Sequence, residues 1–463
     1  MMQSSLAHLA RRIGGANMTA EAAFHGVSTN SRDIAPGNLF VALRGERFDA
    51  HDFLDQVEKS GAAAVVVEKL PPGYSLPALV VPDTRRALGE IASFWRSQFK
   101  IPLIAVTGSN GKTTVKEMIA SVLKAEFGED NVLATRGNFN NDIGVPLTLF
   151  RLEAGHKAAV LELGMNHPGE IALLSAIAQP SVGLVNNAQR EHQEFMASVE
   201  AVAVENGSVI KALPSRGVAV FPADDTFTPL WRGYARNGSH RKMLSFGLNE
   251  EADVSCTWTP SEFGSDLQVK VKEHSFPLRL QAAGAHNVRN ALAAIACCLA
   301  IGVHRKAIVR GLEEFAPVAG RLQKKQGSGG AVVIDDTYNA NPDSVRAAID
   351  VLAQCPAPRS LVLGDMGEVG QEGRQFHIEI GAYARGRGIE NLLTLGELAQ
   401  HASLAFGAHA RHCEDMETLQ QAAAALAKPG TTLLIKGSRF MKMERVVQHL
   451  TGESRGKPGQ EAH

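Results

Sequence analysis

Residues 103–123 read LIAVTGSNGKTTVKEMIASVL, and this stretch decides the fold class of the chain. Its first four residues are apolar, as expected for a buried strand. After Gly108 and Gly111 the apolar residues recur at the i, i+3, i+4 spacing of a helix: Val115, Met118, Ile119, Val122 and Leu123. The stretch therefore predicts a strand, a tight glycine loop and a helix that packs on a sheet, the repeating unit of parallel α/β folds.

The loop between this strand and helix, residues 107–114, has the composition of a phosphate-binding loop. Its glycines let backbone N–H groups turn toward phosphate oxygens, and the amino end of a helix favours negative charge. Lys112 can reach terminal phosphates and Thr113 can ligate magnesium. The alternative is a plain helix cap with a solvated lysine, which the agreement of strand, loop and helix disfavours. We refer to residues 107–114 as the phosphate loop.

Strand and helix patterns recur along all 463 residues, a length that suggests about three domains at roughly 150 residues each. We predict a small α/β domain at residues 1–82 and a central parallel-sheet domain at residues 83–318. Alternating short runs at 217–280 predict an antiparallel appendage to the central domain. A Rossmann-like, doubly wound domain follows at residues 319–463, near whose start the glycine-dense segment 324–330 forms a linker or a hairpin loop.

Composition excludes several classes of protein. The 47 basic and 48 acidic residues give a net charge of -1, which argues against a nucleic-acid partner. Hydrophobic residues make up 44% of the chain, enough for several cores, yet no apolar stretch reaches the roughly 20 residues that a bilayer requires. Five cysteines without a CxxC pair indicate neither a disulfide framework nor a zinc site. We therefore expect a cytoplasmic protein without stable membrane insertion.

Polar residues at two further strand ends are candidates for metal binding. Glu162 ends the apolar run 158–163, and His192 follows the run 182–185. Carboxylates and water are the usual magnesium ligands in proteins. On local grounds alone, Glu162 could instead pair with a lysine, and His192 could be an ordinary polar loop residue.

The phosphate loop resembles that of the Mur ligases, which are ATP-dependent amide-forming enzymes. A standard GxxxxGK[ST] loop would carry glycine where this chain has Val106, and the departure itself matches the family. The resemblance implies an ATPase-type central domain, in which a carboxylate attacks the γ-phosphate of ATP and an amine then attacks the acyl phosphate. It further implies catalytic roles for Lys112, Glu162 and His192, and magnesium ligation by Thr113, Glu162 and His192.

The resemblance extends in order from about residue 28 to residue 441. It implies ATP contacts both in the phosphate loop and farther along the chain. The residues are Gly108, Ser109, Asn110, Gly111, Lys112, Thr113, Thr114, Asn287, Asn290, Arg321, Asp336 and Asn339. It implies substrate contacts by Ser31, Arg32, Asn138, Asn140, Asn141, Asn341, Lys436, Ser438 and Arg439. Considered locally, many of these residues could equally be helix caps, turn residues or surface charges.

Residues 335–342, DDTYNANP, discriminate best among family members, because they resemble the branch that adds D-alanyl-D-alanine. This branch implies UDP-N-acetylmuramoyl-tripeptide and D-alanyl-D-alanine as substrates, with the amino-terminal domain holding UDP. We expect a monomer. Two alternatives are a folylpolyglutamate synthase-like ligase, in which the phosphate loop lies near the amino terminus, and a nucleotide-binding protein without turnover.

One residue departs from the family pattern. Asn206 occupies the position at which Mur ligases commonly carry a carbamylated lysine. An amide cannot add carbon dioxide to form a carbamate, so a second metal would lose a charged oxygen ligand. We therefore expect activity that does not depend on bicarbonate.

Overall fold

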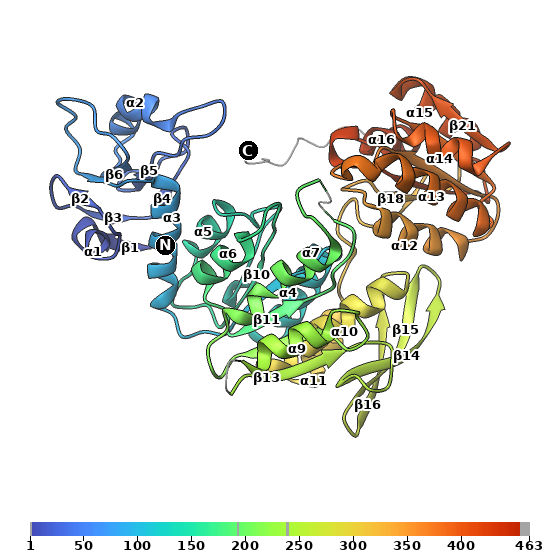
Figure 1. The fold of residues 1–463 in the computed structure, drawn as a ribbon, viewed down its shortest axis with the longest axis horizontal. Helices are drawn as coiled ribbons and strands as arrows, with labels where there is room; N and C mark the ends of the chain where they lie inside the picture. Colours follow the sequence, from blue (N-terminus) through green and yellow to red (C-terminus); the bar gives the residue numbers. More distant parts are fainter. Residues whose placement is uncertain (1, 192–193, 238–239, 454–463) are drawn as a thin grey trace.

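The computed structural model describes residues 2–191, 194–237 and 240–453. Figure 1 shows three lobes, with the amino-terminal and carboxyl-terminal lobes on either side of a central one. No helix within these ranges is long and apolar enough to span a membrane. The mixed α/β architecture with parallel sheets confirms the predicted fold class.

The amino-terminal lobe contains a five-stranded sheet. In spatial order its strands are β2 (Asn17–Met18), β7 (Ala78–Val80), β6 (Ala64–Val67), β5 (Leu39–Val41) and β4 (Val27–Ser28). All neighbours are parallel except β2 and β7. An antiparallel pair, β1 (Gln3–Ser5) and β3 (Ala23–His25), lies beside it. The helices of this lobe are α1 (Leu6–Ala10) and α2 (Leu54–Lys59), the latter preceded by the 3-10 turn η1 (Ala50–Phe53).

The central lobe is built on a nine-stranded sheet. Its spatial order is β16 (His274–Leu280), β15 (Gly264–Val271), β14 (Val254–Ser261), β13 (Lys242–Phe246), β12 (Val218–Pro222), β11 (Val182–Val185), β8 (Leu103–Thr107), β10 (Ala158–Glu162) and β9 (Val132–Ala134). Only β14, β15 and β16 pair antiparallel. The antiparallel part is thus narrower than the predicted range 217–280, because helix α9 (Thr228–Arg236) crosses over between β12 and β13 and makes them parallel.

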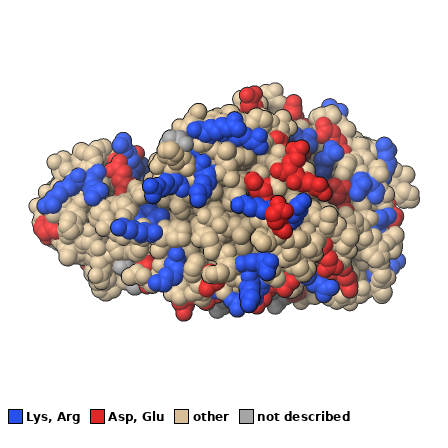
Figure 2. Space-filling view, turned by 90° about the horizontal axis from the view of Figure 1, so that it is seen from below, with Lys and Arg blue, Asp and Glu red and all other residues tan. Residues whose placement is uncertain are grey.

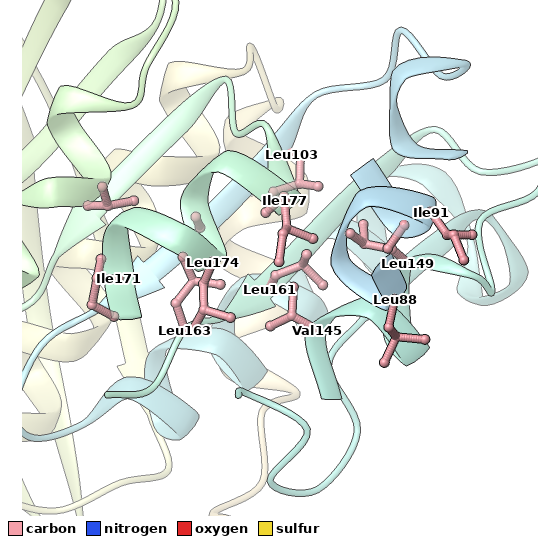
Figure 3. Packing of buried hydrophobic residues seen from close by; sticks show 14 of the residues in the cluster. Leu88, Ile91, Leu103, Val145, Leu149, Leu161, Leu163, Ile171, Leu174 and Ile177 are labelled. Carbon is pink, nitrogen blue, oxygen red and sulfur yellow. The ribbon is translucent and has the colours of Figure 1, made fainter. Parts of the chain in front are cut away.

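Side chains alternate between the two faces of the central sheet, as strand geometry requires. Ile104 and Val106 of β8 pack under helices α4 (Lys112–Phe127), α10 (Ala285–Ala300) and α11 (Arg305–Glu313). Leu103 and Ala105 face the other side, which is covered by α3 (Thr84–Ser97), α5 (Gly144–Leu149) and α6 (Glu170–Ala178). Figure 3 shows this second face, with labelled side chains Leu88, Ile91, Leu103, Val145, Leu149, Leu161, Leu163, Ile171, Leu174 and Ile177.

The same apolar cluster continues into the amino-terminal lobe, because Leu39, Val41 and Val66 belong to it. Helix α3 contributes Leu88 and Ile91 to this shared core. The two lobes are therefore joined by a continuous apolar interior. Helix α7 (Val199–Asn206) ends beside the phosphate loop, because Asn206 contacts Gly108, and α8 (Ser208–Lys211) follows it directly. The 3-10 turn η2 (Glu129–Asn131) lies at the opposite edge of the sheet, where it leads into β9.

The carboxyl-terminal lobe is a six-stranded, doubly wound sheet. Its order is β17 (Gln323–Gln326), β18 (Val332–Asp336), β22 (Thr432–Lys436), β19 (Arg359–Gly364), β20 (Asn391–Leu395) and β21 (Ala410–Cys413). Its helices are α12 (Pro342–Ala353), α13 (Gly373–Gly386), α14 (Ala399–Phe406), α15 (Met416–Leu426) and α16 (Glu444–Thr451), with turns η3 (Gly370–Glu372) and η4 (Arg439–Met441). Since β17 and β18 pair antiparallel, the segment 324–330 belongs to a hairpin.

Surface and cysteine chemistry agree with the composition. On the face seen in Figure 2, basic and acidic side chains are interspersed. All five cysteines are free, and burial raises the pKa of Cys256 to about 11. At neutral pH this buried thiol stays protonated and unreactive.

Candidate functional site

A polar cavity of about 760 Å³ lies between the central sheet and the carboxyl-terminal lobe. That volume falls within the usual range for small-molecule sites. Seventeen of the residues predicted from the sequence line it: Ser109, Asn110, Gly111, Lys112, Thr113, Thr114, Asn138, Asn140, Asn141, Glu162, Asn287, Asn290, Arg321, Asp336, Asn339, Asn341 and Lys436. The cavity thus gathers side chains that are distant in the sequence from the central and carboxyl-terminal lobes.

Other predicted residues lie elsewhere. Ser31 and Arg32 are on the amino-terminal lobe and do not line the cavity; Asn30 Oδ1 accepts a hydrogen bond from the Arg32 N–H at 3.1 Å, which forms a local turn. His192 lies outside the described residues. Gly108 lies behind the cavity wall, in the turn that follows β8.

Ser438 and Arg439 are also not part of the cavity wall. The Ser438 hydroxyl accepts a hydrogen bond from the Gly367 N–H at 2.6 Å and donates one to the Ala340 carbonyl at 3.1 Å. Arg439 pairs with Glu444 at 3.2 Å. In this structure both residues hold loops of the carboxyl-terminal lobe in place.

The phosphate loop depends on two glycines for its shape. Gly108 has φ +133° and Gly111 has φ +80°, conformations that side chains rarely adopt. A Cβ atom on Gly111 would lie 2.5 Å from Asn290 Oδ1, and one on Gly108 would lie 2.9 Å from the Cβ of Asn186. The close packing of neighbouring elements therefore excludes larger residues at both positions.

Lys112 is held at the mouth of this loop. Its Nζ donates to the carbonyls of Gly108 at 2.6 Å and Ser109 at 3.1 Å, and pairs with Glu191 Oε1 at 2.9 Å. The Lys112 side chain is 14% exposed. An anionic ligand entering the cavity would compete with Glu191 for this ammonium group.

Thr113, the first-turn residue of α4 predicted to ligate magnesium, contacts the carboxyl-terminal side of the cavity. Its hydroxyl accepts a hydrogen bond from Arg321 Nη2 at 2.9 Å. The Arg321 guanidinium also lies over the ring of Tyr338 at 4.2 Å. Because Arg321 comes from the segment between α11 and β17, it connects the phosphate loop with the junction of the two lobes.

Glu162 provides a test of the predicted cation site. Its Oε1 accepts a hydrogen bond from Asn140 Nδ2 at 2.9 Å, while its buried Oε2 has no hydrogen-bond partner among the described residues. Leaving a buried carboxylate oxygen unsatisfied is costly, so this oxygen fits a cation or a bound water. Among residues 2–191, 194–237 and 240–453, no group of three or more His, Cys, Asp or Glu side chains is arranged to hold a metal ion. A magnesium ion here would take further ligands from phosphate and water oxygens, as it usually does.

A network of amides surrounds the phosphate loop, and part of it was missed from the sequence. Asn186 Nδ2 donates to the Asn110 carbonyl at 2.8 Å and to Asn290 Oδ1 at 3.0 Å. Asn187 Oδ1 accepts from the Asn110 N–H at 2.9 Å. Asn186 and Asn187 directly follow β11, so the strand-end rule that selected Glu162 could have found them.

Asn206 also touches the phosphate loop. The residue is 1% exposed, and its Oδ1 accepts a hydrogen bond from the Gly108 N–H at 3.0 Å. Its own carbonyl accepts from the Thr107 hydroxyl at 3.2 Å. A neutral amide therefore anchors the first turn of the loop from the end of α7.

The carboxyl-terminal wall of the cavity carries a buried ion pair. Lys436 Nζ lies 2.6 Å from Asp336 Oδ2 and donates to the Asn339 carbonyl at 2.9 Å. Nearby, burial lowers the pKa of His286 to about 4, although the charge of Asp336 opposes this shift. His286 is therefore neutral at pH 7.

Family models match most of the chain. The Mur ligase middle domain matches residues 106–298, the Mur ligase glutamate ligase domain matches residues 320–439, and the Mur ligase family catalytic domain matches residues 23–96. The three matches follow one another along the sequence in the order of the three lobes.

Full-length relatives agree with these models. The chain is 39% identical to the UDP-N-acetylmuramoyl-tripeptide--D-alanyl-D-alanine ligase of Escherichia coli strain K12, over 97% of this chain and 99% of that protein. A crystal structure of MurF from Acinetobacter baumannii superposes with a TM-score of 0.91 at 35% identity, covering 98% of this chain and 100% of that one. MurF ligase from Thermotoga maritima in complex with ADP gives a TM-score of 0.83 at 27% identity, over 93% and 97% of the two chains. The chain therefore belongs to the Mur ligase family of ATP-dependent peptide ligases.

Proposed function

We propose that this protein joins D-alanyl-D-alanine to UDP-N-acetylmuramoyl-tripeptide, forming the UDP-muramoyl-pentapeptide precursor of peptidoglycan and releasing ADP and phosphate. The supporting observation is the cavity that brings Lys112 of the phosphate loop together with Asn341 and Lys436 of the carboxyl-terminal lobe. Full-length relatives whose names specify this activity add to that support.

The reaction proceeds through an acyl phosphate. A carboxylate oxygen of the tripeptide attacks the γ-phosphorus of ATP, an O–P bond forms, and ADP leaves. The amine of the dipeptide then attacks the acyl carbon and loses a proton, and phosphate departs as the amide forms. The first step brings an anionic carboxylate against the polyanionic nucleotide, and the second leaves negative charge on the departing phosphate, so Lys112 would stabilise both by exchanging Glu191 for phosphate oxygens.

Magnesium is part of this proposal. Thr113 and Glu162 would hold magnesium, and His192 would hold a second magnesium ion. When bound, these ions would neutralise charge on the phosphates. The unpaired Oε2 of Glu162 supports this role, as described above.

The substrates divide among the three predicted domains. We assign the UDP moiety to residues 1–82 through Ser31 and Arg32, ATP to residues 83–318, and the dipeptide with further ATP contacts to residues 319–463. Since these contacts lie on different lobes, closure of the lobes would assemble the site. We further propose that the protein works as a monomer in the cytoplasm, the compartment that its free cysteines favour.

Phosphate release from ATP tests the function. We expect release only when UDP-N-acetylmuramoyl-tripeptide and D-alanyl-D-alanine are both present, with a pentapeptide product detected by mass spectrometry. Release with a folate and glutamate would instead support the folylpolyglutamate synthase-like alternative. ATP binding with no release under any substrate combination would support a nucleotide-binding protein without turnover.

Magnesium dependence is tested separately. Chelation with EDTA should abolish phosphate release, and added magnesium should restore it. The Glu162→Gln variant should require a higher magnesium concentration for half-maximal activity, because an amide oxygen is a weaker ligand than a carboxylate. An unchanged magnesium requirement in this variant would contradict the role proposed for Glu162.

A further inference from the structure

Arg190 makes a cluster of contacts between two lobes, and these contacts have no part in the reaction steps proposed above. It lies in the 186–191 segment after β11, directly before Glu191. Its Nη2 pairs with Asp343 Oδ1 at 2.8 Å, and its Nη1 pairs with Glu379 Oε2 at 3.0 Å. Its guanidinium lies 5.2 Å from the centre of the Phe376 ring. The backbone N–H of Arg190 donates to Asp343 Oδ2 at 3.0 Å as well.

All these partners belong to the carboxyl-terminal lobe. Asp343 lies in the first turn of α12, and Phe376 and Glu379 lie on α13. The planar guanidinium is thus held from two helices and by an aromatic face. Such multidentate contacts fix geometry better than a single exposed ion pair.

A second contact next to this cluster joins the same helix to the phosphate loop. Asn341 Nδ2 donates to Asn110 Oδ1 at 2.8 Å. Asn341 also caps α12, because its Oδ1 accepts from the Ser344 N–H at 2.8 Å. The amino end of α12 is therefore attached to the central lobe at two points, Asn110 and Arg190.

The 186–191 segment also touches the lysine of the phosphate loop. Glu191 pairs with Lys112, while its neighbour Arg190 holds α12. One short segment thus links the position of the carboxyl-terminal lobe to the position of Lys112.

We propose that Arg190 is a positioning residue for the ligase reaction, which docks the amino end of α12 against the phosphate loop so that the lobe presenting the dipeptide faces the nucleotide. The proposal rests on the proposed function for its kinetic consequence. Its structural consequence, the docking of the lobe, is independent of that function.

Small-angle scattering of the full chain tests the docking. The Arg190→Ala variant should give a larger radius of gyration than the parent protein. The matched control is Arg387→Ala, because Arg387 pairs with Asp350 of the same helix at 2.9 Å but within one lobe. This control should scatter like the parent. Equal scattering by the parent and Arg190→Ala would overturn the proposal.

Steady-state kinetics separate positioning from a general loss of structure. Arg190→Ala should raise the KM for D-alanyl-D-alanine about tenfold, while the affinity for an ATP analogue and the melting temperature stay close to those of the parent. Arg387→Ala should leave the KM unchanged. The positioning role would be overturned if Arg190→Ala impaired dipeptide binding, ATP-analogue binding and the melting temperature alike. It would also be overturned if Arg190→Ala and Arg387→Ala had equal effects.

Charge reversal gives the sharpest outcome. The Arg190→Asp variant should be impaired, and adding Asp343→Arg should restore at least part of both the compaction and the KM. No restoration in either measurement would contradict direct pairing. If the parent itself releases no phosphate with these substrates, the proposed function fails, and the scattering arm still decides whether Arg190 docks the lobe.

Discussion

Two sheet edges of this molecule each carry a lysine, and the two lysines are held differently. Lys112 follows β8 of the central sheet and pairs with Glu191, a residue from another loop. Lys436 ends β22 and pairs with Asp336, its direct neighbour in the adjoining strand β18. The Lys112 side chain is 14% exposed, whereas that of Lys436 is 3% exposed.

Because their partners and exposures differ, Lys112 can exchange its partner, whereas Lys436 is fixed. The partner of Lys112 sits on a loop and faces an open cavity, so a phosphate can replace it. The partner of Lys436 is part of the same sheet, and burial makes separation of the pair costly. We therefore expect Lys112 to act mainly in the proposed chemistry, and Lys436 also to hold its lobe together.

The largest expected effect is that of removing the exchangeable lysine. The Lys112→Ala variant should lose ligase activity by at least about 1,000-fold, because it removes the ammonium group that lies against the phosphate loop itself. Phosphate release under saturating substrates measures this loss. The control Lys124→Ala removes an exposed lysine of the same helix that pairs with Glu129, and it should retain activity. Joining at the parent rate by Lys112→Ala would contradict the whole interpretation of the site.

The fixed lysine should have its main effect on stability. The Lys436→Met variant leaves Asp336 charged and buried, which should destabilise the protein by about 3–5 kcal/mol. Chemical denaturation followed through the carboxyl-terminal lobe measures this change. Adding Asp336→Asn should recover part of the loss, and the half-exposed Lys324→Met should be nearly neutral. A Lys436→Met protein as stable as its parent would contradict the claim that Lys436, unlike Lys112, is fixed by its ion pair.

A smaller effect is expected from the anchor of the phosphate loop. The Asn206→Ala variant leaves the Gly108 N–H without its acceptor, at a cost of about 1–3 kcal/mol. Because the lost bond shapes the loop, the KM for ATP should rise about tenfold while the exposed Asn17→Ala control stays unchanged. An unaltered KM would show that the loop keeps its shape without Asn206.

Bicarbonate sharpens the interpretation of the same residue. Addition of bicarbonate to the parent protein should not change its rate, because the amide of Asn206 cannot be carbamylated. Assays in carbon dioxide-depleted buffer, with and without bicarbonate, make this comparison. Stimulation by bicarbonate would imply that a lysine elsewhere in the chain is carbamylated, and would count against the alignment that places Asn206 at the family's lysine position.

The smallest effect concerns pH and a histidine inside the carboxyl-terminal lobe. Burial lowers the pKa of His377, whose Nε2 accepts from the Met366 N–H at 3.1 Å. The folded state therefore favours neutral histidine, so this stabilisation is present above about pH 6.5 and is lost as the pH falls through the lowered pKa. The melting temperature should drop by about 2–4 °C more between pH 7 and pH 5 in the parent than in His377→Leu. Parallel pH profiles for the two proteins would contradict this role.

The phosphate loop was predictable because its signal is local. Glycines at positions 108 and 111, a lysine at the helix start and an apolar helix face all lie within about twenty residues. Glu162 was predictable for a similar reason, since it ends a recognisable apolar strand. Resemblance to Mur ligases then supplied the roles of residues that carry no local signal, such as Asn287 and Arg321.

Other features had no such signal. Nothing near Arg190 in the sequence indicates that it meets Asp343, which lies 153 positions away. The predicted antiparallel range 217–280 was too wide because β12 and β13 have the short apolar pattern of either sheet type, and only the crossover through α9 makes them parallel. Strand β21 was missed, since three of its four residues, Ala410, Arg411 and His412, are not fully buried, and two of these three are polar.

The sequence by itself determined the alternation of strands and helices and the position of the glycine loop, because these patterns depend on residues close together in the chain. Tertiary structure decided the partners: Glu191 on Lys112, Asp336 on Lys436, and Asn206 on Gly108. The physical reason is that charge pairing and burial depend on distances in space, which are set by how the sheets close and the lobes dock. Sequence patterns can therefore identify a candidate functional lysine, but only the fold determines whether that lysine can exchange its partner.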